Sequence, residues 1–125
     1  MKAMDPRTPL LTVSNLRKGP VTYCTLTIER EHPILQGHFP GQPVVPGVCI
    51  IQAVRDALEA VLEKKMIMAG ADQIKFLQPI LPDKVSWAEM EVTLKENAGE
   101  ILKVTAQITG DGVVFVKFRA FFRDK

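Results

Sequence analysis

Residues 46–62 read PGVCIIQAVRDALEAVL, and this stretch carries the longest helical pattern in the chain. Proline suits the first turn of a helix, where its missing N–H is not needed. Apolar residues then recur at helical spacing, and they are Val48, Ile51, Val54, Ala57, Leu58, Val61 and Leu62. A polar stripe follows another face and consists of Gln52, Asp56, Glu59 and Glu63. The pattern predicts one long helix whose apolar first turns are deeply buried.

Strand patterns lie on both sides of this helix. Residues 21–29 alternate between apolar and polar side chains, which is the period of a half-buried strand. A loop rich in proline, residues 31–45, joins that strand to the helix. Further strands are predicted at residues 71–77, 85–94, 101–109 and 113–122. The turn Gly110-Asp111-Gly112 is typical of a hairpin between the last two strands.

This order of elements predicts an α+β fold in which an antiparallel β-sheet wraps around one long central helix. The length of 125 residues fits a single domain, with 1–20 as an N-terminal extension and 21–125 as the core. The last strand is apolar on both faces, which is unusual in so small a chain. We therefore expect a second subunit to cover the outer face, in a dimer or a higher oligomer.

Composition narrows the class of function. The net charge is only +2 and the basic residues are scattered, which argues against a nucleic-acid binder. We expect no membrane span and no secretory signal, because no stretch approaches about 18 apolar residues and the N-terminus holds Asp5 and two prolines. Cys24 and Cys49 lack histidines at zinc-ligand spacing, so we interpret both as small buried apolar residues. A reducing cytoplasm is the expected location.

The most specific motif is HFPGQPVVPGV at residues 38–48. It resembles the active-site signature HFPGxPxxPGV of the FabZ-type and FabA-type β-hydroxyacyl-acyl-carrier-protein dehydratases, and every fixed position matches. Downstream, GADQIKF at residues 70–76 and the Pro82-Asp83 turn fall where that family has a strand and a turn. The resemblance covers residues 23–125 and implies the hotdog fold.

The resemblance also implies a reaction, the loss of water from a 3-hydroxyacyl thioester in fatty-acid or polyene-type biosynthesis. His38 would be the base, and a backbone N–H of Gly47 or Val48 would polarise the thioester carbonyl. Phe39, Gly47 and Val48 would contact the substrate. Because Gly47 has no Cβ, a thioester could approach its amide closely. We expect His32, which precedes the motif, to be structural or exposed.

The implied partner is an acyl carrier protein, or coenzyme A, carrying the thioester. A modest basic surface would suit such an acidic partner. We expect no metal and no redox cofactor, because the phosphopantetheine arm arrives with the substrate.

The chain departs from the family fourteen positions after His38, where the family has a catalytic Glu or Asp and this chain has Gln52. An amide can donate and accept hydrogen bonds, but it does not transfer a proton at a useful pKa. General acid–base catalysis commonly raises a rate by about 10²–10⁴, so without another acid the replacement should lower the activity severely.

Three hypotheses follow from this departure. The chain is a dehydratase that is slow or uses another acid, such as Asp56 or Glu59, although Asp56 is expected in the solvated stripe. Alternatively, it is an impaired thioester-binding subunit that completes a site with an intact paralogue, because the family builds its site across a dimer interface. The third hypothesis is a hotdog thioesterase, which we rank last because those enzymes rarely carry this motif.

Overall fold

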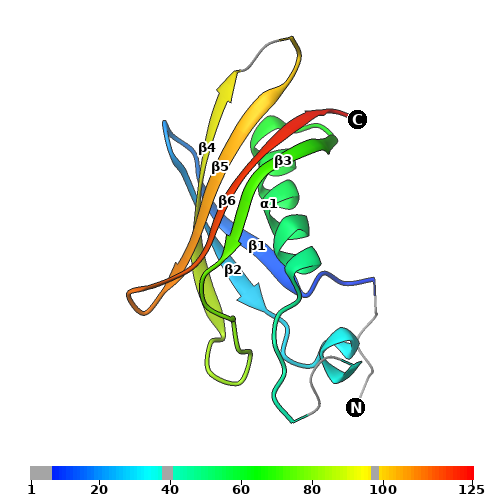
Figure 1. Ribbon diagram of the computed structural model, residues 1–125, viewed down its shortest axis with the longest axis vertical. Coiled ribbons are helices and arrows are strands. Elements are labelled where there is room, and N and C mark those ends of the chain that lie inside the picture. Colours follow the sequence, from blue (N-terminus) through cyan, green and yellow to red (C-terminus); the bar gives the residue numbers. More distant parts are fainter. Residues whose placement is uncertain (1–6, 38–40, 97–98) are drawn as a thin grey trace.

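The computed structural model describes residues 7–37, 41–96 and 99–125. Within these ranges, α1 is the one long helix, as the sequence predicts (Figure 1). The elements in chain order are β1 Leu11–Arg17, β2 Thr22–Ile28, the 3₁₀ helix η1 Pro33–Gly37, α1 Gly47–Leu62, β3 Met66–Phe76, β4 Trp87–Glu96, β5 Leu102–Gly110 and β6 Val113–Asp124.

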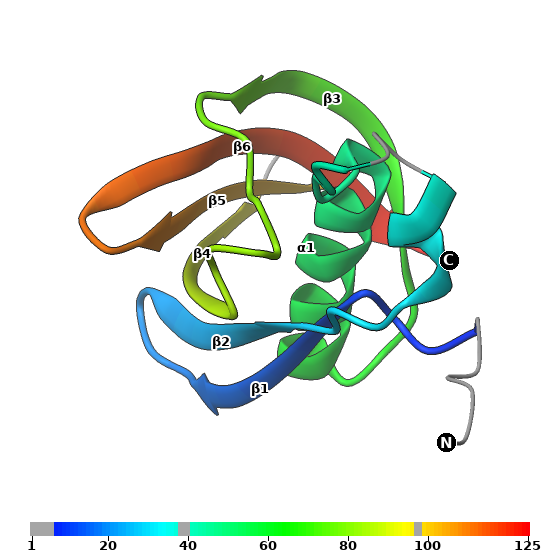
Figure 2. The ribbon, with the colours of Figure 1, turned by 90° about the horizontal axis from the view of Figure 1, so that it is seen from below.

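The six strands form one antiparallel sheet in the order β1-β2-β4-β5-β6-β3. Strands β4, β5 and β6 are a meander, and the turn at Asp111 and Gly112, both with positive φ, closes its second hairpin as predicted. The sheet curls around α1, so that β1 and β3 lie at opposite edges with the helix between them (Figure 2). This confirms the predicted α+β arrangement of an antiparallel sheet wrapped around a central helix.

The first strand differs from the sequence prediction. We expected residues 1–20 to precede the core, yet β1 pairs with β2 through Leu11↔Ile28 and Val13↔Leu26. Leu11 is buried against the helix side of the sheet, while the register shifts between Ser14 and Arg17. Asn15 lies in this irregular stretch with a φ of 52°. The apolar alternation is therefore only three residues long before it breaks, which is why the sequence alone did not reveal the strand.

Strand β3 also begins earlier than expected, at Met66 rather than at residue 71. It pairs with β6 along its length, but the register shifts between Met68 and Gly70 and again between Ala71 and Gln73. Each irregularity changes which side chains face the helix, so the sequence shows no continuous period of two. The bulged strand is consistent with a sheet that bends around α1.

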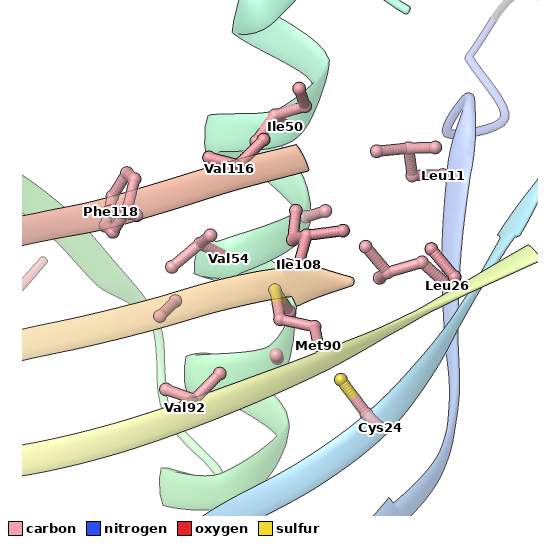
Figure 3. Packing of buried hydrophobic residues seen from close by; sticks show 14 of the residues in the cluster. Leu11, Cys24, Leu26, Ile50, Val54, Met90, Val92, Ile108, Val116 and Phe118 are labelled. Carbon is pink, nitrogen blue, oxygen red and sulfur yellow. The ribbon is translucent and has the colours of Figure 1, made fainter. Parts of the chain in front are cut away.

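The hydrophobic core lies between α1 and the concave face of the sheet (Figure 3). The helix contributes Ile50, Ala53, Val54, Ala57 and Leu58. Residues that face them from the strands are Cys24, Leu26, Met90, Val92, Ile108, Val116 and Phe118.

Burial also governs the two cysteines. It raises the pKa of the Cys24 thiol to about 11, so that the side chain behaves as the small apolar group that we expected. Cys49 is only half-buried, and burial raises the pKa of its thiol too.

Most apolar side chains of β6, the last strand, are buried by other residues of the same chain. Val116, Phe118, Ala120 and Phe122 are buried on the helix side, and Phe115 on the other side is 7% exposed. Phe121 remains half-buried on the outer face. A second subunit over this face thus stays a prediction. No helix in the described ranges is long and apolar enough to cross a membrane.

Truncation of a core side chain of α1 tests this packing. We expect Leu58→Ala to lower the free energy of unfolding by about 2–5 kcal/mol, because Leu58 is 0% exposed and its loss leaves a cavity. The control Leu77→Ala removes the same atoms from a side chain that is 48% exposed, and its cost should be within about 0.5 kcal/mol. Urea unfolding measures both values, and equal costs would contradict the packing described here.

Candidate functional site

The first turn of α1 presents backbone N–H groups at one end of the sheet. Pro46 is the N-cap residue, with φ −66° and ψ 146°, and among the described residues no side chain forms a cap hydrogen bond. Hydrogen bonding to the cap begins with Cys49 N, which donates to Pro46 O at 3.0 Å, and Ile50 N follows. The N–H groups of Gly47 and Val48 precede any partner carbonyl within the helix. Together with the helix dipole, they form a place where negative charge on an oxygen is stabilised.

Two apolar hollows meet beside this helix start, at Val48 and Gln52, which line both. The N-terminal hollow, about 230 Å³, is completed by Thr8, Pro9, Leu10, Leu11, His32, Ile34 and Cys49. The β3 hollow, about 250 Å³, is completed by Ile51, Arg55, Ile67, Met68 and Phe122. The prediction of deeply buried first turns is wrong at Val48, which is 68% exposed between the two hollows, because no strand of the described sheet covers this side of the helix start. The helix start therefore faces a largely apolar surface that suits an acyl chain.

Gln52 makes two short contacts along its own helix. Its Oε1 accepts a hydrogen bond from Arg55 Nη2, and its Nε2 donates to Asp56 Oδ1, both at 2.7 Å. Asp56 is half-buried rather than part of a fully solvated stripe. Burial raises the pKa of its carboxyl, against the opposing effects of the Gln52 hydrogen bond and the Arg55 charge. A carboxyl therefore lies one turn from Gln52 and in contact with it.

The structure places some of the predicted site residues but not others. Gln52, Gly47 and Val48 lie together on the first turns of α1. His38 and Phe39 lie outside the described residues, so their roles stay predictions.

The structure gives a different reason for a glycine at position 47 than the one we expected. A Cβ built on Gly47 would come within 2.9 Å of Phe76 Cζ, so the glycine makes room for the Phe76 ring. That ring is itself 53% exposed, and the sequence analysis did not single it out. Its place follows from the β3–β6 register, which the sequence does not contain.

His32 has the structural role that we expected of it. Its ring is buried, Nδ1 accepts a hydrogen bond from Ile34 N at 3.1 Å, and Nε2 lies 2.6 Å from Thr8 O. Since Nδ1 accepts, Nε2 must carry the proton that is donated to Thr8 O. The side chain thus fastens the segment ahead of β1 to η1, and both segments line the N-terminal hollow.

Arg55 was missed by the sequence analysis. The signal that could have found it is helical spacing, because residues three and four positions apart are neighbours on a helix surface. Arg55 and Asp56 stand in those positions relative to Gln52. Among the described residues, no three His, Cys, Asp or Glu side chains are grouped to hold a metal ion. The absence of a cofactor remains a prediction.

The family model described as ApeI-like, ApeI dehydratase, matches residues 16–120. The chain belongs to this family. It is also similar to enzymes named 3-hydroxyacyl-[acyl-carrier-protein] dehydratase FabZ. The protein of Anaeromyxobacter sp. (strain K) is 32% identical over 111 residues, which cover 78% of this chain and 69% of that protein. That of Nitratiruptor sp. is 28% identical, and the alignment covers 99% of this chain and 95% of that protein.

Solved structures show the same fold at low sequence identity. A sigma28-regulated virulence protein from Campylobacter jejuni superposes with a TM-score of 0.69 at 12% identity, over 98% of this chain and 92% of that one. A protein from Pyrococcus horikoshii gives 0.67 at 14% identity, over 100% and 95%. The ApeI-like chain therefore has the hotdog fold, as its motif implied. These likenesses concern the fold alone.

The raised pKa of Asp56 gives a pH-dependent effect on stability. A carboxyl whose pKa is raised by folding favours the neutral form in the folded state, so its contribution to stability is lost as the pH rises through that pKa. The variant Asp56→Asn stays neutral at every pH. We expect its Tm, relative to the wild type, to be higher at pH 7 than at pH 4.

Thermal unfolding at several pH values measures this difference. Asp111→Asn, on the exposed turn between β5 and β6, is the matched control, and its Tm difference should change less with pH. A constant difference for Asp56→Asn between pH 4 and pH 7 would show that burial does not penalise the Asp56 carboxylate.

Proposed function

We propose that this chain is a hydro-lyase of the 3-hydroxyacyl-acyl-carrier-protein dehydratase type. Membership of the ApeI-like dehydratase family and similarity to FabZ proteins support a dehydratase-like function. The observation that carries the proposal is the position of the Gly47 and Val48 amides, which have no hydrogen-bond partner among the described residues, beside Gln52 and between two apolar hollows. Such a surface binds an acyl chain and presents donors to its oxygen atoms.

In the proposed reaction, the thioester carbonyl accepts hydrogen bonds from the first amides of α1. These donors and the helix dipole stabilise the enolate that forms when His38 removes a proton from C2. The C3–O bond then breaks, a double bond forms between C2 and C3, and the hydroxyl leaves as water. Because Gln52 cannot release a proton, we assign the proton of that water to the protonated His38 ring.

The proposed reaction should be slow, because Gln52 cannot act as an acid. A site in which one histidine performs both proton transfers lacks the separate acid found in the family that the motif resembles. Since general acid catalysis contributes about 10²–10⁴, the reaction should be slower than in relatives that keep the carboxyl. The amide would still bind the hydroxyl of the substrate, which is why we place Gln52 in the site.

The reaction is tested by measuring the interconversion of 3-hydroxyacyl and trans-2-enoyl carrier protein. We expect turnover by the wild type and a loss of about 10²–10⁴ in kcat for His38→Ala, because the base is removed. Gln36→Ala is the control, since Gln36 is exposed and lies two positions earlier. Turnover by His38→Ala at the wild-type rate would refute the assignment of His38.

The substitution Gln52→Glu tests whether the missing acid limits the rate. The new carboxyl would stand between Asp56 and Arg55; two adjacent carboxyl groups raise the pKa of one of them, and since Arg55 favours the ionised form at position 52, the proton is held by Asp56. A protonated acid would then be available near neutral pH, so we expect kcat to rise by about tenfold or more. Unchanged or lower activity in a folded variant would show that the absence of a carboxyl at this position is not what limits the reaction.

One observation favours a second candidate function. Gln52 stands where the resemblance implies an acid, and each end of its amide makes one hydrogen bond within its own helix. The chain would then be a thioester-binding subunit that supplies His38 to a site completed by the carboxyl of an intact paralogue. Purification of the untagged protein from its natural cells distinguishes the two functions. An active dimer of this chain alone would exclude the second, whereas an inactive chain that purifies with an active paralogue would support it.

A further inference from the structure

We propose that Arg55 and Asp56 are positioning residues that fix the Gln52 side chain as a hydrogen-bond donor to an oxygen of the acyl substrate. This inference rests on the proposed function and adds a specificity to it. A donor fixed beside the apolar hollows would favour acyl groups that carry a 3-hydroxyl over saturated acyl groups of the same length.

The charges of its two neighbours determine the orientation of the Gln52 amide. A guanidinium group can only donate and an ionised carboxylate can only accept. With Oε1 against Arg55 and Nε2 against Asp56, both contacts are favourable and both are 2.7 Å long. A flipped amide would place its oxygen against the carboxylate and its N–H groups against the guanidinium, so that both contacts become repulsive. The two side chains therefore hold one orientation of the amide.

Besides the second lone pair of Oε1, this orientation leaves one N–H of the Gln52 amide for a ligand. Nε2 carries two hydrogen atoms, and one of them is donated to Asp56 Oδ1. Asp56 lies one turn further into the helix, whereas Val48 lies one turn back toward the helix start. Gln52 lines both hollows together with Val48, and Asp56 lines neither. We infer that the second N–H is directed toward the surface on which the acyl chain would lie.

The state of Arg55 supports a positioning role. Its Nε is buried without a hydrogen-bond partner among the described residues, while its Nη2 reaches Gln52. A buried N–H without a partner lowers stability, so filling space alone does not account for this conformation of Arg55. Arg55 also lines the β3 hollow beside Ile67 and Met68. The half-buried setting strengthens its contact with Gln52, because charges are less screened there than in water.

The fixed amide distinguishes this site from one with a carboxyl at the same position. A carboxyl can give its proton to a leaving hydroxyl, whereas the amide N–H can only bind the oxygen of that hydroxyl. The backbone amides of Gly47 and Val48 and the side-chain amide of Gln52 are then separate donors on the first turns of α1. The backbone amides would bind the thioester carbonyl, and the Gln52 amide would bind the 3-hydroxyl.

The orientation itself can be tested without any substrate. In ¹⁵N-labelled protein, the side-chain NH₂ signals of Gln52 are identified by their loss in Gln52→Leu. We expect two well-separated proton shifts in the wild type, because one proton bonds a carboxylate. Asp56→Ala should bring the two shifts closer together, while Asp56→Asn should keep them apart, because its carbonyl oxygen still accepts. Unchanged signals in a folded Asp56→Ala would overturn the proposal.

The specificity is tested by calorimetric binding of two unreactive probes, 3-hydroxyoctanoyl pantetheine amide and octanoyl pantetheine amide. We expect the wild type to bind the hydroxyl probe about tenfold more tightly, the effect of one hydrogen bond from a fixed donor. The preference should fall to about twofold or less in Gln52→Leu, Asp56→Ala and Arg55→Met. Asp56→Asn, Arg55→Lys and the distant control Asp111→Asn should retain most of it.

The outcomes separate the inference from the proposed function. Equal preference in the wild type, Asp56→Ala and Arg55→Met would refute the positioning role even if the protein proves to be a dehydratase. Failure of every variant to bind either probe would contradict the proposed function, and the NMR signals alone would then decide whether the amide is fixed. Should Asp56→Ala not fold, Arg55→Met provides the same comparison from the other end of the amide.

Discussion

The structure depends on the burial of one helix face against a curled sheet. Val54 and Leu58 of α1 have no exposed surface, and the strands on both sides supply the matching apolar residues. A flat sheet could not contact so much of the helix, and the bulges in β1 and β3 accompany the bending. The first turn of α1 emerges at the end of the sheet, and the amides of Gly47 and Val48 there have no hydrogen-bond partner in the described part of the chain. The candidate site is therefore a consequence of how the core is packed.

Partial burial determines the pKa of Asp56 and the strength of the hydrogen bonds among the polar residues of α1. Gln52, Arg55 and Asp56 stand on neighbouring positions of the helix surface, too deep for full solvation and too shallow for complete burial. In this setting desolvation raises the pKa of the Asp56 carboxyl, and hydrogen bonds to charged partners are strong. The same three side chains on an exposed helix face would move freely and leave Gln52 without a fixed orientation.

Much of the fold could be predicted because its signals are local. The helical period of residues 46–62 and the Gly110–Gly112 turn each depend on a few neighbouring residues, and both predictions were confirmed. Strand β1 and the first half of β3 could not be predicted, because their alternation is interrupted at Asn15 and between Met68 and Gln73. Those segments become strands only because β2 and β6 offer them partners, and pairing between distant segments leaves no mark in either segment alone.

The candidate site, like the fold, has some features that the sequence determines locally and others that arise only from contacts between distant segments. By itself, the sequence determined the motif at residues 38–48, the start of the helix at Gly47 and the presence of an amide at position 52, since each is a matter of residue identity and spacing. The tertiary structure decided that Phe76 covers Gly47, that His32 fastens the segment before β1, and that Asp56 is half-buried in contact with Gln52. Contacts and burial of this kind depend on how strands distant in the sequence close around the helix, and they exist only once the chain has folded.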